Sequence, residues 1–169
     1  GIIEATRSFR DPRTTPATLA AASALVAADA DRAGIIRALY RSTPLTTLQL
    51  WGRVLARLKS DDARRLVWAS VSESDFTESA TSPADLPGVL DDLVVNLPTA
   101  EAAALLYATR TGVRALIRSY RHRDARTLVS PLPAIGTAER VELTFSADTA
   151  LADAEAELIR TLREALARE

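Results

Sequence analysis

The chain has 169 residues, and its 21 basic and 22 acidic side chains leave a net charge of −1. This balance argues against a globally basic nucleic-acid-binding protein, so any anion site must be local. The absence of cysteine and the single histidine exclude disulfides, thiolate zinc sites and histidine-rich metal sites. No apolar run reaches the ~20 residues of a membrane helix, and the chain opens without a signal-peptide pattern. We therefore expect a cytoplasmic protein with no membrane association.

The opening residues predict a strand end and then a helix. Residues 1–9 have the character of a strand end followed by a turn. Thr15 is a suitable helix cap, and Pro16 suits the first helical position because its missing N–H is not needed there. The alanine-rich run that follows favours a helix as far as Ala28.

Two more helices are expected before the apolar pattern changes. The segment 29–31, with two aspartates, interrupts the first helix and offers a cap for the second. Thr43 and Pro44 repeat the cap signal, and apolar residues then recur at helical spacing to Ser60. Three consecutive helices over residues 16–60 predict a helical linker arm.

A change of apolar period at residues 59–63 marks the expected domain boundary. The elements expected after it are, in order, a strand over 66–71, a short helix over 74–78, a helix over 83–97, a hairpin with strands 102–108 and 113–120, a short helix over 124–129, a strand over 141–146 and a closing amphipathic helix over 151–166. Residues 131–137 are expected to be irregular. This order predicts an α/β fold in which the N-terminal helical arm precedes a small two-layer domain, residues 64–169, with a mixed β-sheet and packed helices.

The first sixteen residues resemble the last motif of the DHH phosphoesterases, manganese-dependent phosphodiesterases that include RecJ-type exonucleases and nanoRNA hydrolases. The family pattern is roughly G-I-I-x-D-T-G-x-F-R-x-x-N-T-T-P and closes the catalytic domain, so residues 1–15 are interpreted as the end of a catalytic-domain-like strand and its turn. This chain matches the pattern at Gly1, Ile2, Ile3, Thr6, Phe9, Arg10, Thr14, Thr15 and Pro16. The metal-binding aspartate of the family falls on Ala5, and its glycine falls on Arg7. Because alanine has no oxygen for a hard cation, we expect no metal site and no catalytic residue in this chain.

The second half resembles the DHH-associated domain that follows the linker in this family. Residues 113–119 are similar to the family strand that ends in L-R-S, and residues 124–128 lie where the family has V-D-V-S-x-I-A. The glycine-rich G-G-G-H segment that holds phosphate in the family reads here as 131–137, which keeps only Gly136 and contains two prolines without an N–H donor. The resemblance implies a nucleotide or short oligonucleotide as partner, and an upstream DHH catalytic domain as the place where manganese would bind.

Polar residues gather where the second strand of the expected hairpin ends. Guanidinium groups bind phosphate oxygens through paired hydrogen bonds, and the remaining glycine and its neighbour offer backbone donors nearby. The predicted substrate-binding residues are Arg118, Ser119, Arg121, His122, Gly136 and Thr137. The alternative is a solvated turn whose arginines pair with Asp124 and Glu139, with His122 as a surface histidine.

Other clusters have plainer interpretations. The pairs Asp61-Asp62 and Asp91-Asp92 are carboxylates of the kind that bind metals, but adjacent helical residues point about a quarter-turn apart, so solvated faces are favoured. Trp51 and Trp68 are candidates for an aromatic platform for a base, but both lie in apolar-periodic segments and are expected to pack in the core. The arginines at positions 7, 10 and 13 are candidates for a phosphate contact, because the resemblance implies that this segment faces the active-site cleft, but solvent exposure is favoured.

Two functions from different classes remain open. One is the substrate-binding portion of a DHH phosphoesterase-like protein, not catalytic as an isolated chain and part of a hydrolase only if joined to an upstream catalytic domain. The other is a non-catalytic interaction or regulatory domain that kept the fold and lost the metal and glycine-rich phosphate motifs. A third use, contact with tRNA as in similar domains of alanyl-tRNA synthetases, is opposed by the near-neutral charge.

Overall fold

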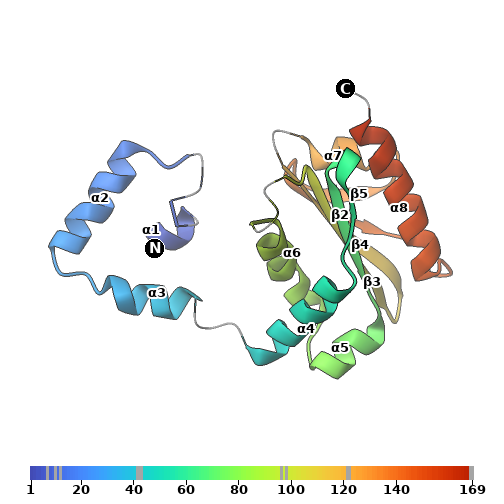
Figure 1. Ribbon diagram of the computed structural model, residues 1–169, viewed down its shortest axis with the longest axis horizontal. Helices are drawn as coiled ribbons and strands as arrows, with labels where there is room; N and C mark the ends of the chain where they lie inside the picture. Colours follow the sequence, from blue (N-terminus) through green and yellow to red (C-terminus); the bar gives the residue numbers. More distant parts are fainter. Residues whose placement is uncertain are drawn as a thin grey trace. The chain divides into compact units, whose positions relative to one another are not determined.

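The chain forms two compact units, Gly1–Pro44 and Leu45–Glu169 (Figure 1). The computed structural model describes residues 1–6, 8–9, 11, 13–40, 44–95, 97, 99–120 and 123–167, without the side chains of residues 39–40 and 92–95.

The first unit consists of three helices in its described part. They are α1 (Ile2–Ala5), α2 (Pro16–Ala27) and α3 (Arg32–Tyr40). The expected start of α2 is confirmed: the Thr15 hydroxyl accepts a hydrogen bond from the Thr18 amide at 3.3 Å, and Pro16 is the first helical residue. The expected break before α3 is also present, where the Asp31 carboxylate accepts a hydrogen bond from the Gly34 amide at 2.7 Å. Side-chain caps thus fix the starts of two helices.

The strand expected over residues 1–9 is wrong, because Ile2–Ala5 forms the helix α1. A strand needs a neighbour to pair with, and the described part of this unit contains no strand. The Glu4 carboxylate instead accepts a hydrogen bond from the amino group of Gly1 at 3.2 Å, which favours a helical start. The expected turn is present, since Ser8 and Phe9 adopt positive φ angles of 60° and 64°.

The second unit is built on a six-stranded sheet in the order β1-β2-β3-β4-β6-β5. Its strands are β1 (Lys59–Asp61), β2 (Leu66–Val71), β3 (Ala102–Thr109), β4 (Gly112–Ser119), β5 (Ala134–Gly136) and β6 (Arg140–Thr144). β2 and β3 pair in parallel and the other neighbours pair antiparallel, so the expected mixed sheet is confirmed. The expected hairpin is confirmed as β3 and β4, joined by Arg110 and Thr111, with Gly112 at a φ of 127°.

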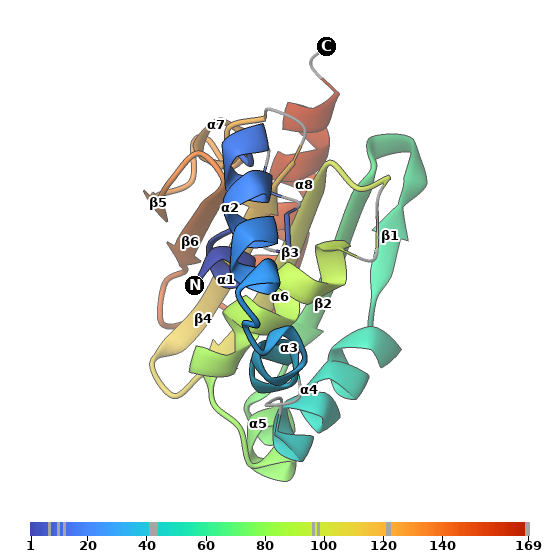
Figure 2. The ribbon, with the colours of Figure 1, turned by 90° about the vertical axis from the view of Figure 1, so that its left-hand side faces the viewer.

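Helices cover both faces of this sheet (Figures 1 and 2). One face is covered by α4 (Leu45–Ala56), α5 (Glu73–Ser79) and α6 (Leu86–Val95), and the other by α7 (Ala125–Leu128) and α8 (Leu151–Leu166). Short 3₁₀ turns lie at Asp62–Arg64 and Pro83–Asp85. The α/β class is confirmed, and the sheet is the middle of three layers, one more than expected.

Alternation along the strands builds the two cores. In β3, Ala104 and Leu106 pack against the α8 side, whereas Leu105 and Tyr107 pack against the α4–α6 side. The closing helix contributes Leu158 to the first core, as its amphipathic pattern predicted. Each face therefore buries its own apolar cluster.

The expected linker arm ends earlier than predicted. The helix α4 stops at Ala56, and Lys59–Asp61 forms the edge strand β1 instead of the last helical turn. Leu50 and Val54 are fully buried in the core of the second unit, so α4 belongs to that unit and the boundary lies at Pro44. Helical spacing gives the face that a helix buries but not the neighbour that buries it. Thr43, the expected cap, lies outside the described residues.

Residues 131–137, expected to be irregular, contain the strand β5. Ala134–Gly136 pairs with β6 at the edge of the sheet that Figure 2 shows opposite β1. Three residues are too few for an alternating pattern, and the two nearby prolines signal a loop, so this strand has no clear signal in the sequence.

Candidate anion-binding site

Two of the predicted binding residues, Arg118 and Ser119, are the last two residues of β4. Successive side chains of a strand point to opposite faces, so Arg118 points to the face covered by α6 and Ser119 to the face covered by α7. Arg121 and His122 lie outside the described residues. The structure therefore does not bring Arg118 and Ser119 together as two arms of one clamp.

Arg118 is a charged side chain in an apolar setting. Its side chain is 10% exposed, and its Nη1 forms an ion pair with the carboxylate of Asp91 on α6. Its guanidinium carbon lies 5.6 Å from the centre of the Tyr120 ring, a distance at which a cation and an aromatic ring attract each other. Burial, the ring and Asp91 together hold the guanidinium in one place.

The Nε–H of Arg118 is buried and has no hydrogen-bond partner in the described part of the chain. A buried donor without a partner costs ~1–3 kcal/mol, and such groups are rare in folded proteins. Arginine has five N–H donors and binds phosphate or carboxylate oxygens through pairs of them. The end of β4 thus contains an immobilised guanidinium with donor capacity that Asp91 does not use.

Ser119 ties the strand to the following loop. Its hydroxyl lies 2.6 Å from the carbonyl oxygen of Arg123 and 3.0 Å from that of Ala138, and its amide donates to the carbonyl of Glu139 at 3.0 Å. The residue is 6% exposed. These contacts place Ser119 in the link between β4 and the segment that leads into β6.

Gly136 and Thr137 close the turn between β5 and β6. Gly136 has a φ of 149°, and a Cβ added to it would lie 2.3 Å from the carbonyl oxygen of Arg140. Only glycine fits such a close backbone approach. The Thr137 amide donates to the same carbonyl at 2.8 Å, and its hydroxyl accepts from the Arg140 amide at 3.2 Å. The glycine is thus explained by turn geometry, and the Thr137 amide is engaged within the turn.

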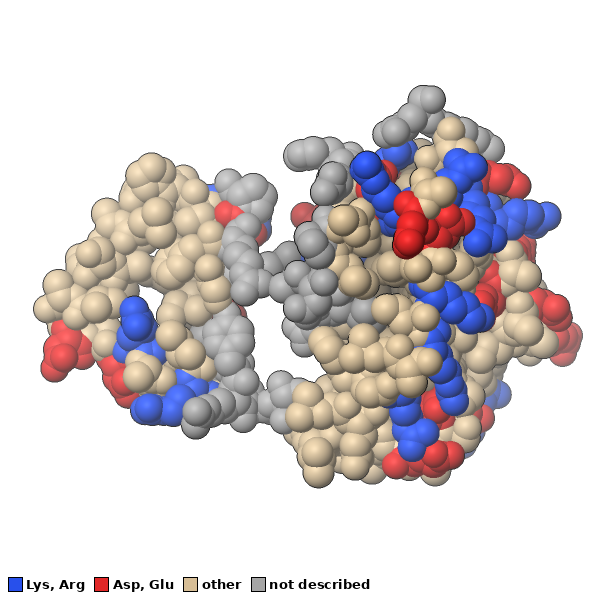
Figure 3. All heavy atoms as spheres, viewed as in Figure 1, with Lys and Arg blue, Asp and Glu red and all other residues tan. Residues whose placement is uncertain are grey.

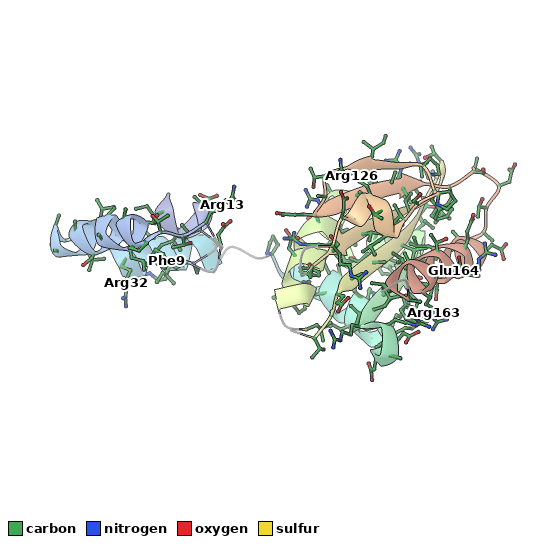
Figure 4. The ribbon with its side chains drawn as sticks, turned by 90° about the horizontal axis from the view of Figure 1, so that it is seen from above. Phe9, Arg13, Arg32, Arg126, Arg163 and Glu164 are labelled. Atoms are coloured by element: carbon green, nitrogen blue, oxygen red, sulfur yellow. The ribbon has the colours of Figure 1, made fainter. Side chains whose placement is uncertain are left out.

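The ion pairs around the site differ from the expected solvated turn. Asp124 precedes α7 and pairs with Arg126 at 2.6 Å; it also caps the helix by accepting a hydrogen bond from the Arg126 amide at 2.9 Å (Arg126 is labelled in Figure 4). Arg123 pairs with Glu101 at 3.3 Å. Sequence reasoning missed Asp91 as the partner of Arg118, because nothing in the sequence indicates which residue of α6 packs over β4.

Two titratable groups elsewhere in the second unit, Glu155 and Tyr107, form hydrogen bonds within the fold. Burial opposes ionisation of Glu155, but hydrogen bonds from Lys59, Ser70 and Trp68 keep the pKa of this carboxyl below its ordinary value. Burial, together with the neighbouring Glu142 carboxylate at 3.0 Å, raises the pKa of the Tyr107 hydroxyl to about 12. Neither group is in a suitable state to act as an acid or base near neutral pH.

Of the other sequence candidates, Arg7 and Arg10 lie outside the described residues, and Arg13 is exposed and pairs with Asp11. Within the described ranges, no three carboxylate, histidine or cysteine side chains come close enough to hold a metal ion. Asp61 accepts a hydrogen bond at 2.7 Å from Arg163, which projects from α8 in Figure 4. Trp68 is buried under α8 and Trp51 packs against the opposite core, so the expected packing role is confirmed and the two rings form no common platform.

The surface carries no single-sign field on the face drawn in Figure 3. Lys and Arg are intermingled with Asp and Glu over the second unit. Among the described helices, none combines the length and the apolar character needed to cross a membrane. On the face drawn in Figure 3, an anion would therefore be recognised by individual residues and not by a broad basic surface.

Comparison with known proteins finds a solved structure with a similar fold. No family model and no curated protein matches the sequence. Among solved structures, the chain is similar to an exopolyphosphatase-related protein from Bacteroides fragilis, with a TM-score of 0.79 and 16% identity over 99% of this chain and 48% of that chain. The chain thus spans about half the length of that protein. At this identity the likeness establishes the α/β fold, and the RecJ-like or nanoRNA hydrolase-like assignment stays a prediction.

Proposed function

We propose that this chain is the phosphate-binding half of a phosphoesterase-like protein, in which residues 45–169 grip a nucleotide or a short oligonucleotide. Two findings support the proposal. The fold is similar over 99% of the chain to about half of an exopolyphosphatase-related protein. The end of β4 carries a guanidinium that is nine-tenths buried and has unused donor capacity.

The proposal depends most on one observation, the buried Arg118 guanidinium with an unpartnered Nε–H. Its Nη1 is within reach of an anion, because the carboxylate of Asp91 already contacts it there. A phosphate oxygen in place of that carboxylate would receive a charge-assisted hydrogen bond, which is about twice as strong as a neutral one. The Tyr120 ring, 5.6 Å from the guanidinium carbon, would keep the group oriented while the anion binds.

The residues that the structure describes do not fit the manganese ions of the DHH phosphoesterases. Ala5 stands where the family has a ligand, and the described residues bring no three carboxylate or histidine side chains together. We therefore assign hydrolysis to residues outside this chain. The contribution of this chain would be to bind and orient a phosphate, the step that positions a substrate for attack.

A second candidate is a non-catalytic interaction or regulatory domain. It is favoured by the state of the polar groups around 119–140, since the Ser119 hydroxyl and the Thr137 amide already have partners within the fold. Pro131 and Pro133 offer no N–H donors where the DHH-associated domain has glycine amides. On this hypothesis the fold serves as a scaffold and no phosphate binds.

Backbone-amide NMR separates the two candidates. A nucleoside monophosphate and an RNA dinucleotide are titrated separately onto the full chain. The phosphate-binding proposal predicts saturable shifts that are largest at Arg118 and its strand neighbours and that weaken with added salt. No response to either ligand at millimolar concentration would contradict the proposal and support the scaffold alternative.

A further inference from the structure

The two partners of the Arg118–Asp91 ion pair differ in how freely they can move. The Arg118 side chain is 10% exposed and lies against the Tyr120 ring, whereas the Asp91 side chain is 42% exposed on α6. Within the described part of the chain, Arg118 is the only hydrogen-bond partner of the Asp91 carboxylate. The carboxylate is therefore the partner that can leave for solvent, and the guanidinium is the partner that stays.

We infer that Asp91 is an intramolecular competitor, a carboxylate that occupies the anion position of Arg118 until a phosphate displaces it. This inference rests on the proposed function, because it concerns the same guanidinium. It adds a regulatory residue on a different element, α6, which nothing in the sequence motifs assigns to binding.

The geometry explains why displacement is feasible. Asp91 contacts Arg118 through one oxygen and one nitrogen, Oδ1 and Nη1, and leaves the Nε–H without a partner. A phosphate has more acceptor oxygens and can accept from more than one N–H of the same guanidinium. The half-exposed Asp91 carboxylate regains its hydration when it leaves, so the exchange replaces a single contact with a more complete one.

Competition lowers the apparent affinity for every anion. When the binding-competent state is only fractionally populated, the apparent dissociation constant rises by the inverse of that fraction. A carboxylate held close to Arg118 thus keeps weak anions out of the site, and only ligands that bind the guanidinium strongly are retained. Asp91 would therefore favour multiply charged phosphates over weakly binding anions.

The test uses the full chain and inorganic tripolyphosphate as the probe, with affinity measured by isothermal titration calorimetry. Asp91→Asn keeps the shape of the side chain and removes the charge that holds Arg118. We expect this variant to bind tripolyphosphate about tenfold tighter than the unmodified chain. The matched control is Glu139→Gln. Glu139 is exposed and lies next to the end of β4, where its backbone carbonyl, and not its side chain, contacts Ser119. We expect the control to change the affinity less than about threefold, as for a screened surface charge.

The outcomes separate this inference from the proposed function. If the unmodified chain binds tripolyphosphate and Asp91→Asn binds it equally well or more weakly, the competitor role is wrong and phosphate binding stands. If neither protein binds tripolyphosphate, both the proposed function and this inference fail. An equal gain in Asp91→Asn and Glu139→Gln would reduce the effect to general charge and would also overturn the competitor role.

A measurement on the unmodified chain covers the case in which Asp91→Asn does not fold. The carboxyl carbon resonance of Asp91 and the Nε–Hε resonance of Arg118 are followed during the same titration. Competition predicts that both resonances move with one midpoint, because the two groups separate as phosphate binds. A shift at Arg118 with an unchanged Asp91 resonance would show that phosphate binds without displacing the carboxylate, and the inference would be wrong.

Discussion

The two units of this chain are ordered by different physical means. The Leu45–Glu169 unit buries one apolar cluster on each face of its sheet, whereas none of the described residues of the Gly1–Pro44 unit is buried. Leu19 and Leu25 of α2 are 50% and 53% exposed. The helices of the first unit are supported by caps and by the propensity of alanine, and those of the second by packing.

The first unit contains an open apolar pocket, and its described side chains form no buried core. A cavity of about 550 Å³ is lined by residues that include Ile2, Phe9, Leu19, Val26 and Ile35. Figure 4 labels Phe9 and Arg32, which both contribute to this lining, and Figure 3 shows that much of the unit's described surface is uncharged. Because packing density and burial give most of the stability of a fold, we expect this unit to contribute little to the global free energy of unfolding.

The largest expected difference between the units is in hydrogen exchange. Amides of β3 and β4 should exchange only through global unfolding, at ~5–15 kcal/mol, whereas amides of α2 should exchange through local opening at a much lower cost. Amide exchange followed by NMR or mass spectrometry measures both. Protection of α2 equal to that of β3 would contradict the contrast.

Truncation of a leucine in each unit sharpens the comparison. Leu106 is fully buried, so Leu106→Ala should lower the free energy of unfolding by ~2–5 kcal/mol. Leu25 is about half-exposed, so Leu25→Ala should change it by less than ~0.5 kcal/mol. Urea denaturation of the two variants gives the values, and a similar loss in both would show that α2 is packed against a stable core.

A buried carboxylate at the α4–α5 junction should give the second unit a pH dependence. Asp75 is 1% exposed; burial would raise its pKa, but hydrogen bonds from the Ser72 hydroxyl and amide, and from Arg57, hold the pKa below its ordinary value. Because the pKa of Asp75 is lower in the folded than in the unfolded chain, its ionised form stabilises the fold at pH values above the unfolded pKa of ~4. This contribution is lost as the pH falls through the folded pKa.

Asp75→Asn should therefore lower the free energy of unfolding at pH 7 by ~1–3 kcal/mol and flatten its decline below pH 4. Asp148→Asn is the matched control, since Asp148 is an exposed loop residue. The free energies of unfolding of both variants, measured by denaturation between pH 2 and 7, test the sign of this effect. A pKa shift of one unit corresponds to ~1.4 kcal/mol in this free energy. An acid profile of Asp75→Asn that parallels the unmodified chain would contradict the assignment.

The most local expected effect concerns the helix caps. Thr15→Ala removes the hydroxyl that accepts the Thr18 amide and should cost α2 ~0.5–2 kcal/mol, which frays its first turn. Asp124→Ala should leave α7 in place, because Ala125 and Leu128 are buried. Cα chemical shifts along both helices report the result. Fraying of α7 but not of α2 would contradict the view that caps support α2 and packing supports α7.

The sequence predicted most elements whose signals are local. The Thr15-Pro16 start of α2, the hairpin with Gly112 at its turn and the short helix that became α7 each depend on neighbours within a few residues. Features that depend on distant partners were missed. The burial of α4 by the second unit and the pairing of β5 with β6 are tertiary effects that periodicity cannot express.

The site shows the same division. Arg118 was predicted from its place at a strand end, and the alternation of a strand places it and Ser119 on opposite faces. Its partner Asp91 lies 27 positions away on α6, so only the packing of that helix on β4 brings the pair together. The sequence therefore predicted Arg118 as a binding residue but contained no signal for Asp91 as its ion-pair partner.

The central claim is that the buried guanidinium of Arg118 binds phosphate. The most direct measurement compares the affinity of the unmodified chain, Arg118→Met and Arg160→Met for a nucleoside monophosphate, with Arg160 as an exposed arginine of α8 on the other face of the sheet. We predict that Arg118→Met weakens binding more than about tenfold, the value of a charge-assisted hydrogen bond, and that Arg160→Met leaves it unchanged. Equal affinities of Arg118→Met and the unmodified chain would contradict the claim.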